Sequence, residues 1–550
     1  MTGERRGWQG LRSLLFLALL GGILAGGISL RCYRLFDLPA GPWIDEAYAL
    51  RAAREATAGG WRHVPASAPL QPPGAPFVNA WVTGPYLAFT SVVDRASGGG
   101  IASFRLVSLL PALLLLAGGI LLAWELFRPR REAFLLAGFL LASSSWMLST
   151  SRWGWNANFS AAFVVLSAFA ALRAARTERR PFALFLAGCA GALLGVAQYG
   201  YQSAWLVAPA PFLVLAATAS GGRSSPSWRP RVEAAAAACA GLLLVAAPLT
   251  LHFASHPERA AARPKELWVG TGGAAPALGK FAENVQGYAG LFVVGGDRNE
   301  RHGDPGRPAL PVAVSGLAAV GLAATTRSPR TGLLSLVVLL LLLGGLLAGG
   351  EGPNAFRISA AATFLVVLSV WGGLALVALL PPGVQARGQG LLAGTLLLVG
   401  ALDAASFLDW LRSPRLLGAF GGPERELADA IRGEILSGRA DGVMLDPRAA
   451  RNPWVVDVLL APPSGGGGRA LAWSVVSPVS MSRAAASGRA VLVAAPRTAE
   501  ALEAIGAAGG EAVARSTPLE GFPGWILCRV GAIRARSPEG GLPGPRTGLR

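Results

Sequence analysis

The sequence has few charged residues and few cysteines for its length. Only 15% of its 550 residues are Asp, Glu, Lys or Arg, whereas a soluble chain carries roughly 25%. No pair among the four cysteines has the spacing of a metal or redox motif: Cys32, Cys189, Cys239 and Cys528. These shortages argue against an ordinary soluble protein, a disulfide framework and a zinc site, so neither a metal nor a cofactor is expected.

Lysine is nearly absent, with only Lys265 and Lys280, so arginine supplies almost all of the positive charge. The net charge is strongly positive, +18, which is a feature of many nucleic-acid-binding proteins. Here, however, the arginines stand in short clusters between apolar runs, as the anchors on the cytoplasmic side of membrane proteins do. We therefore expect a membrane and no nucleic acid as the partner of this charge.

The abundant feature is the long apolar run. Hydrophobic residues make up 52% of the chain, and its mean hydropathy is +0.46. Runs of about 18 to 25 residues are long enough to cross about 30 Å of hydrocarbon. The fold class is therefore an α-helical polytopic membrane protein with about 11 transmembrane helices, predicted at 12–30, 104–126, 133–150, 157–174, 182–200, 202–219, 232–251, 309–325, 331–349, 357–380 and 389–410.

The arginine clusters predict the orientation of these spans. With the N-terminus inside, all clusters fall on the cytoplasmic side only if the weaker stretch 76–93, which Gly84 and Pro85 interrupt, does not cross. That stretch is expected to be a juxtamembrane or re-entrant helix on the outer surface. The first span lacks a cleavage site and is expected to be an uncleaved signal anchor. The outer segments are then 31–103, 151–156, 198–203, 252–308, 350–356 and everything after 411, and they hold most of the polar residues.

The composition becomes that of a soluble domain after the last span. Strands are expected at 442–445, 490–494 and 525–530, and helices at 424–436, 449–460 and 498–507. This alternation is typical of a small α/β domain. We predict a transmembrane domain at 1–411, an extracytoplasmic α/β domain at 412–534 and a disordered tail at 535–550.

Two adjacent carboxylates, Asp45 and Glu46, follow the first span. An acid pair at a membrane surface is costly to bury unless it is paired or functional. Either carboxylate is able to accept a proton from an acceptor hydroxyl as a general base. The alternative is an acid pair at headgroup level, solvated by water.

Three arginines stand near the outer ends of spans, where positive charge is unusual: Arg105, Arg152 and Arg357. A guanidinium binds a phosphate through two parallel hydrogen bonds. Arg152 lies in a polar and aromatic run that ends with Asn156. The alternative is that these arginines reach the lipid headgroups and do nothing else.

Three further outer motifs are polar. Gln71 precedes Pro72 and Pro73, which fix an extended turn. Tyr201 lies in a Gln-Tyr-Gly-Tyr-Gln turn and belongs either to the aromatic belt at the membrane surface or to a polar cavity. The charged loop 296–308 contains a lone histidine without a second one at ligand spacing, and a structural role is favoured for it over substrate contact.

The order of these motifs resembles the membrane glycosyltransferases of the C-type fold, specifically glycosyltransferase family 39 with its protein O-mannosyltransferases and aminoarabinose transferases. The matching features are the pair Asp45-Glu46, the Pro-Pro of the first outer segment, Arg105 at the start of a span and the sequence Ser151-Arg152. Gln71 stands where aminoarabinose transferases have a lysine. The second acidic motif of some C-type enzymes is missing from 151–156, so metal dependence is not supported.

The resemblance implies transfer of a sugar from a polyprenyl-phosphate donor to a protein, lipid or glycan acceptor outside the cytoplasm, with inversion at the anomeric carbon. By the family pattern, Asp45 would be the catalytic base, with Glu46 beside it. The lipid phosphate and the substrates would be contacted by Arg105, Arg152, Gln71, Tyr201, Arg357 and Asn156. The implied location is the inner membrane of a bacterium.

Other classes of function predict other patterns. A transporter or flippase would place polar groups at mid-span, whereas these spans are almost pure Ala, Leu, Gly and Val. A lipid-glycan ligase of the cell envelope would share the same outer face and differ only in its acceptor. A non-catalytic scaffold would need none of the outer acids and arginines.

Overall fold

The computed structural model describes most of the chain, in two compact units, the first ending at Phe420 and the second beginning at Gly421. The described residues are 2–58, 68–69, 81–82, 84–218, 229–255, 257, 268–325, 329–349, 352–450, 452–461, 472–473, 479, 481, 485–486, 490–516 and 524–530.

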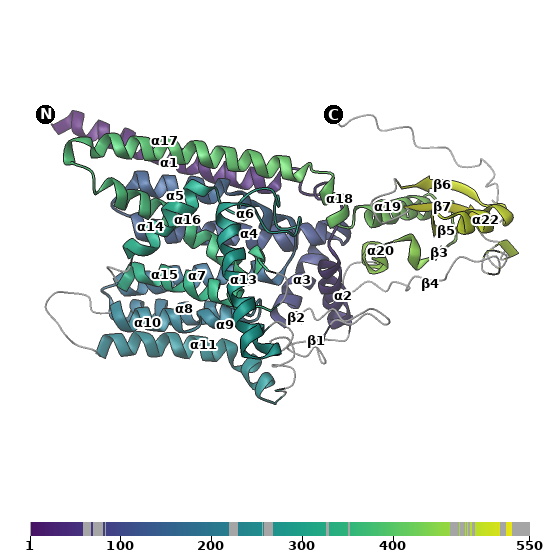
Figure 1. The fold of residues 1–550 in the computed structure, drawn as a ribbon, viewed down its shortest axis with the longest axis horizontal. Coiled ribbons are helices and arrows are strands. Elements are labelled where there is room, and N and C mark those ends of the chain that lie inside the picture. Colours follow the sequence, from purple (N-terminus) through teal and green to yellow (C-terminus); the bar gives the residue numbers. More distant parts are fainter. Residues whose placement is uncertain are drawn as a thin grey trace. The chain divides into compact units, whose positions relative to one another are not determined.

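The first unit is a bundle of apolar helices. Among the described residues, seven helices are long and apolar enough to cross a membrane: α1 (Thr2–Cys32), α4 (Gly100–Phe127), α7 (Asn156–Arg176), α8 (Arg180–Gln198), α11 (Arg229–Ser255), α16 (Ser359–Val377) and α17 (Pro382–Leu411). Figure 1 shows α17, α5, α8 and α11 of this bundle running in nearly the same direction.

The remaining predicted spans correspond to a bent pair and to shorter helices. α5 (Arg131–Ser143) and α6 (Ser145–Ser149) continue into η1 (Thr150–Arg152), with a bend of 49°. The shorter apolar helices are α9 (Ser203–Val207) with α10 (Pro209–Thr218), α14 (Val312–Thr325) and α15 (Pro329–Leu346). Each of the predicted spans thus coincides with a helix, and the chain is a multi-pass membrane protein.

Small residues allow the helices of the bundle to approach closely. A Cβ added to Gly372 of α16 would lie 2.0 Å from the carbonyl oxygen of Leu317 in α14. A Cβ added to Gly191 of α8 would lie 1.8 Å from the carbonyl oxygen of Ala238 in α11. Glycine at such a crossing brings two backbones into van der Waals contact, which is the main source of attraction between helices in lipid.

The segments that were predicted to lie outside the membrane contain helices that the sequence analysis placed imperfectly. After α2 (Ile44–Ala58), the strands β1 (Ala68–Pro69) and β2 (Trp81–Val82) pair antiparallel. α3 (Gly84–Ser97) begins at the glycine and proline that were expected to interrupt the stretch 76–93. Within the outer segment 252–308, η2 (Val269–Gly272) precedes a 20-residue helix, α13 (Ala274–Val293), which was not predicted.

The second unit is a small α/β domain, as expected. Its sheet has the order β4-β3-β5-β7-β6, with β3 parallel to β4 and β5, and β7 antiparallel to β5 and β6. Its strands are β3 (Gly442–Leu445), β4 (Ala472–Trp473), β5 (Val491–Pro496), β6 (Glu511–Arg515) and β7 (Trp525–Val530). Its helices are α19 (Gly422–Leu436), η4 (Pro447–Ala449), α20 (Pro453–Leu460) and α22 (Ala499–Ala507).

Candidate active site

The site is built around the first turn of α2. Glu46 is the third residue of this helix, and its Oε2 accepts a hydrogen bond of 2.7 Å from the backbone N–H of Trp43, the residue that precedes the helix. A glutamate at this position satisfies an N–H group that has no partner within the helix. Acidic residues are also favoured here by the helix dipole. The sequence therefore fixes the position of the Glu46 carboxylate locally.

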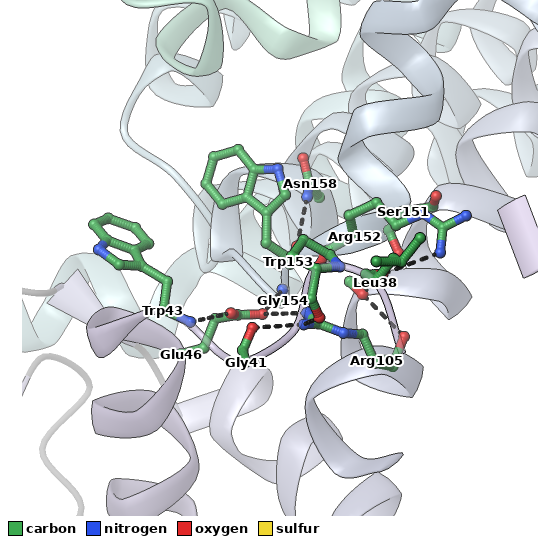
Figure 2. Close-up of polar contacts among 12 residues, drawn as sticks. Leu38, Gly41, Trp43, Glu46, Arg105, Ser151, Arg152, Trp153, Gly154 and Asn158 are labelled. Atoms are coloured by element: carbon green, nitrogen blue, oxygen red, sulfur yellow. Dashed lines mark hydrogen bonds and ion pairs between the residues drawn. The ribbon is translucent and has the colours of Figure 1, made fainter. Parts of the chain in front are cut away.

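The same carboxylate joins α2 to two other segments. Its Oε1 accepts a hydrogen bond from the backbone N–H of Gly154 and lies 4.0 Å from the Arg105 guanidinium of α4. Glu46 is 2% exposed and Arg105 is fully buried. Figure 2 shows the three residues around this carboxylate. The predicted convergence of an outer acid and an outer arginine is therefore present, through Glu46.

Backbone carbonyls occupy the Arg105 guanidinium. Its Nη2 donates to the carbonyl oxygens of Pro39 at 2.8 Å and Gly41 at 2.6 Å, and its Nη1 donates to that of Arg152. These bonds hold the segment before α2 against α4 and η1 (Figure 2). Three backbone carbonyls thus satisfy N–H groups of Arg105, and the Glu46 carboxylate 4.0 Å away is its charged partner.

Arg152 is held in the same way. It is fully buried and donates to the carbonyl oxygens of Leu30 at 3.0 Å and Leu38 at 3.3 Å. Its guanidinium lies 5.4 Å from the centre of the Phe407 ring. The two predicted phosphate ligands Arg105 and Arg152 thus lie together, joined by the hydrogen bond to the Arg152 carbonyl. A direct contact of either with phosphate stays a prediction.

Asp45 has a different environment from its neighbour. It is half-buried, on the first turn of α2. It lies close enough to Tyr48 that its negative charge, together with the burial of the phenol, raises the pKa of Tyr48. The acid pair of the sequence is therefore divided, with Glu46 inside a hydrogen-bonded network and Asp45 at its more accessible edge.

A charged outer loop reaches the same helix terminus. The Arg301 guanidinium lies 3.8 Å from the centre of the Trp43 ring, and its Nε donates to Asn299 Oδ1 at 2.8 Å. A cation at this distance from an aromatic face is attracted by the ring quadrupole. The sequence analysis did not select Arg301 or Trp43, because neither type of contact leaves a spacing signal.

A buried histidine of this loop, His302, packs against the helix bundle. His302 Nδ1 is hydrogen-bonded to Asp297, whose Oδ2 also accepts from the backbone N–H of Ala355 at 2.7 Å. The imidazole stacks on the Trp153 ring at 5.1 Å. Burial lowers the pKa of His302, while Asp297 acts in the opposite direction. The described residues hold no cluster of three or more metal-binding side chains.

The other predicted residues lie around this centre. Arg357 belongs to η3 (Ala355–Ile358), which Asn354 caps, and it is half-buried. Within the part of the chain that the structure describes, the Arg357 guanidinium makes no hydrogen bond or ion pair. Tyr201 packs against the aromatic cluster that contains Phe407. Asn156 is the buried first residue of α7, and Gln71 lies outside the described residues.

Two solved structures resemble the whole chain. Both are of ArnT from Cupriavidus metallidurans. The apo state is 14% identical, with a TM-score of 0.51, covering 96% of this chain and 98% of that chain. The undecaprenyl phosphate-bound state is 13% identical, with a TM-score of 0.54, covering 95% and 98%. No family model and no curated protein matches the sequence. The chain has the C-type glycosyltransferase fold, and the expected fold class is confirmed.

Proposed function

We propose that the protein is a membrane glycosyltransferase that moves a sugar from a polyprenyl-phosphate donor to an acceptor outside the cytoplasm, with inversion. The observation that carries the proposal is the buried network in which Arg105 lies 4.0 Å from the Glu46 carboxylate and donates to the backbone carbonyl of Arg152, whose own guanidinium is also buried. Two guanidiniums and one carboxylate leave an excess of positive charge in an environment of low dielectric. Such a centre stabilises an anionic leaving group, and Asp45 stands beside it.

In the proposed reaction, Asp45 takes the proton from the acceptor hydroxyl. The acceptor oxygen forms a bond to the anomeric carbon while the bond from that carbon to the phosphate oxygen breaks. The electron pair of the broken bond leaves with the polyprenyl phosphate. Attack and departure occur on opposite faces of the sugar, which inverts the anomeric configuration. A half-buried carboxylate suits this role better than Glu46, whose two oxygens already accept backbone N–H groups.

The three outer arginines have different parts in this proposal. Arg357 contacts the lipid phosphate, because its guanidinium is half-buried and makes no hydrogen bond with other described residues. A free guanidinium matches the geometry of a phosphate. Arg105 and Arg152 act through their charge and by holding the loops around Asp45. Their hydrogen bonds to carbonyls keep them in place before the substrate arrives, which is the condition for electrostatic catalysis.

The donor is proposed to be lipid-linked. The ArnT structure with undecaprenyl phosphate is an instance of this fold with a polyprenyl phosphate bound. An isoprenoid chain gains about 0.8 kcal/mol for each CH₂ group that it buries. We place the enzyme in the inner membrane of a bacterium, with the N-terminus inside and the second unit outside. The rival functions are a transporter or flippase and a ligase that transfers a lipid-linked glycan.

The experiment is transfer from radiolabelled polyprenyl-phosphate sugars by membranes that contain the wild type or Asp45→Asn. Asp37→Asn is the matched control, because Asp37 is an exposed carboxylate in the same outer segment, paired with Arg34. We expect transfer in the wild type and in the control, and its loss in Asp45→Asn. Equal transfer in all three would remove Asp45 as the base. Absence of transfer from every lipid-linked sugar would favour the rival functions.

A further inference from the structure

A large open cavity lies beside the proposed reaction centre. It has a volume of about 820 Å³ and is formed by α13, residues 297–299 and residues 352–354. Cavities that hold small ligands are about 300–1,000 Å³ in volume. The size therefore suits a molecule of one or two sugar rings.

The lining of this cavity is polar and electrically balanced. Side-chain amides come from Asn284, Gln286, Asn299 and Asn354. Among the described residues, the charged lining residues are two cations and two carboxylates, which are Lys280, Arg298, Glu283 and Asp297. An amide offers both donors and acceptors, as a sugar hydroxyl requires. A balanced charge does not select an anion such as a phosphate, and the described lining residues include no aromatic ring or long aliphatic side chain for a lipid tail.

One amide is fixed in orientation by the fold. Asn284 is 2% exposed, and its Nδ2 donates to the carbonyl oxygens of Leu346 at 2.9 Å and Ala348 at 2.7 Å. Its Oδ1 lies beside Gly352, where an added Cβ would approach to 2.8 Å. Glycine at this position allows the backbone to pack closely against the amide, which further fixes its orientation. Such prior orientation lowers the entropic cost of binding.

The cavity is connected to the reaction centre at two points. Asn299 accepts a hydrogen bond from Arg301, whose guanidinium lies over Trp43 at the start of α2. Asn354 caps the short helix that carries Arg357 by accepting its backbone N–H. The cavity thus borders the residue that caps the helix of Arg357, the arginine that we assign to the lipid phosphate. The group attached directly to that phosphate is the sugar of the donor.

We infer that this cavity binds the sugar of the lipid-linked donor, while the phosphate is held at Arg357. This inference rests on the proposed function. In this arrangement the donor sugar lies in the polar cavity along α13, and the acceptor lies elsewhere, on the side of Trp43 where Asp45 stands.

The test uses Gln286→Trp in the full chain. Gln286 is an exposed lining residue that makes no hydrogen bond with other described residues, so the indole fills the cavity without removing an internal contact. Ala282→Trp is the matched control, one turn earlier on α13, exposed and outside the lining. Binding is measured in detergent with undecaprenyl phosphate alone and with its mannose, glucose, galactose, N-acetylglucosamine and aminoarabinose derivatives. Transfer kinetics are measured with the derivative that binds most tightly.

We expect the wild type to bind at least one sugar derivative about tenfold more tightly than the bare carrier, or about 1.4 kcal/mol. Gln286→Trp should abolish this gain in binding and raise the KM for the donor, while the KM for the acceptor is unchanged. Ala282→Trp should leave both the gain in binding and the donor KM as in the wild type. A wild type that binds all carriers equally overturns the inference, as does a gain that survives in Gln286→Trp. A rise in the acceptor KM alone would assign the cavity to the acceptor. Absence of transfer with a sugar-dependent gain in binding would reject the proposed function and keep the sugar site.

Discussion

The substitution Glu46→Gln separates the structural acid of the pair from the proposed catalytic one. Glutamine keeps the size of the side chain and removes its charge. It also replaces one acceptor oxygen by an NH₂ group, which faces either the N–H of Trp43 or that of Gly154, both donors. At the same time the buried Arg105 guanidinium, 4.0 Å away, loses its carboxylate partner.

The size of the effect follows from these contacts. Removing one partner of a buried ion pair costs about 3–5 kcal/mol. Arg105 retains its three backbone carbonyls, which places the loss at about 3 kcal/mol, the lower end of that range. Asp45→Asn removes a half-buried charge from the first turn of α2, where the helix dipole contributes about 0.3–1 kcal/mol. The adjacent substitutions should therefore differ in stability by about 2 kcal/mol or more.

The assay is denaturant unfolding of the purified protein in detergent, combined with sugar transfer at a temperature where all variants are folded. Glu46→Gln should lower stability strongly. Asp45→Asn should lower it little and reduce transfer by about 10²–10⁴-fold, the range for loss of a general base. Asp37→Asn controls for loss of charge in the same segment. If Asp45→Asn destabilises the protein as much as Glu46→Gln does, the assignment of a structural role to Glu46 and a catalytic role to Asp45 is wrong.

Three further predictions concern other parts of the site and fold. Arg357→Gln should raise the donor KM at least about tenfold with an unchanged midpoint of unfolding, whereas Arg105→Gln should lower that midpoint. A lowered midpoint in the Arg357 variant would contradict its assignment. Because burial holds the pKa of His302 below its ordinary 6.5, the unfolded chain binds the proton more readily. The contribution of neutral His302 to the stability of the loop 296–308 is therefore fully present above pH 6.5 and decreases as the pH falls below 6.5. The measurement is hydrogen exchange of the loop amides, corrected for the intrinsic exchange rates. Protection independent of pH between 7 and 5 would refute this. Gly372→Ala should destabilise the bundle by about 1–3 kcal/mol through overpacking, while Gly394→Ala, with open space around it, should not. Equal unfolding midpoints would contradict the close crossing.

The elements with strong periodicity were predictable from the sequence. Each apolar span became a helix because its length and composition leave few alternatives in a membrane. The strands β3 and β7 have the predicted bounds, since each is an apolar segment with a neighbouring strand on both sides. The edge strands β4 and β6 were not predicted. An edge strand pairs with a neighbour on one side only, so its sequence needs a less regular apolar pattern than that of an interior strand. α13 was missed, although its apolar residues Phe281, Val285, Tyr288 and Phe292 recur at the spacing of a helix.

The sequence indicated several residues that the structure brings together, but it did not indicate their contacts. Arg105 and Arg152 were selected because their predicted outer position is an exception to the charge distribution of the loops. Their hydrogen bonds to backbone carbonyls were not visible, because every residue supplies the same carbonyl group. The role of Asp297 and His302 was hidden for a related reason. Alternating charge indicated a solvated loop, whereas stacking on Trp153 buries the imidazole.

The way in which Arg105 and Arg152 are held decides between a structural and a catalytic interpretation. Burying a guanidinium is costly, and a carboxylate partner for each would reduce the cost. In the network of Figure 2, Arg105 has the Glu46 carboxylate as a partner at 4.0 Å, whereas backbone carbonyls satisfy the N–H groups of Arg152 and leave its charge in place. A purely structural site gains nothing from an unneutralised charge, since neutral residues of similar volume would stabilise it as well or better. A site that must stabilise a phosphate leaving group does gain, because the field of a fixed charge acts without reorganisation. The excess positive charge is therefore better explained by the reaction than by the fold.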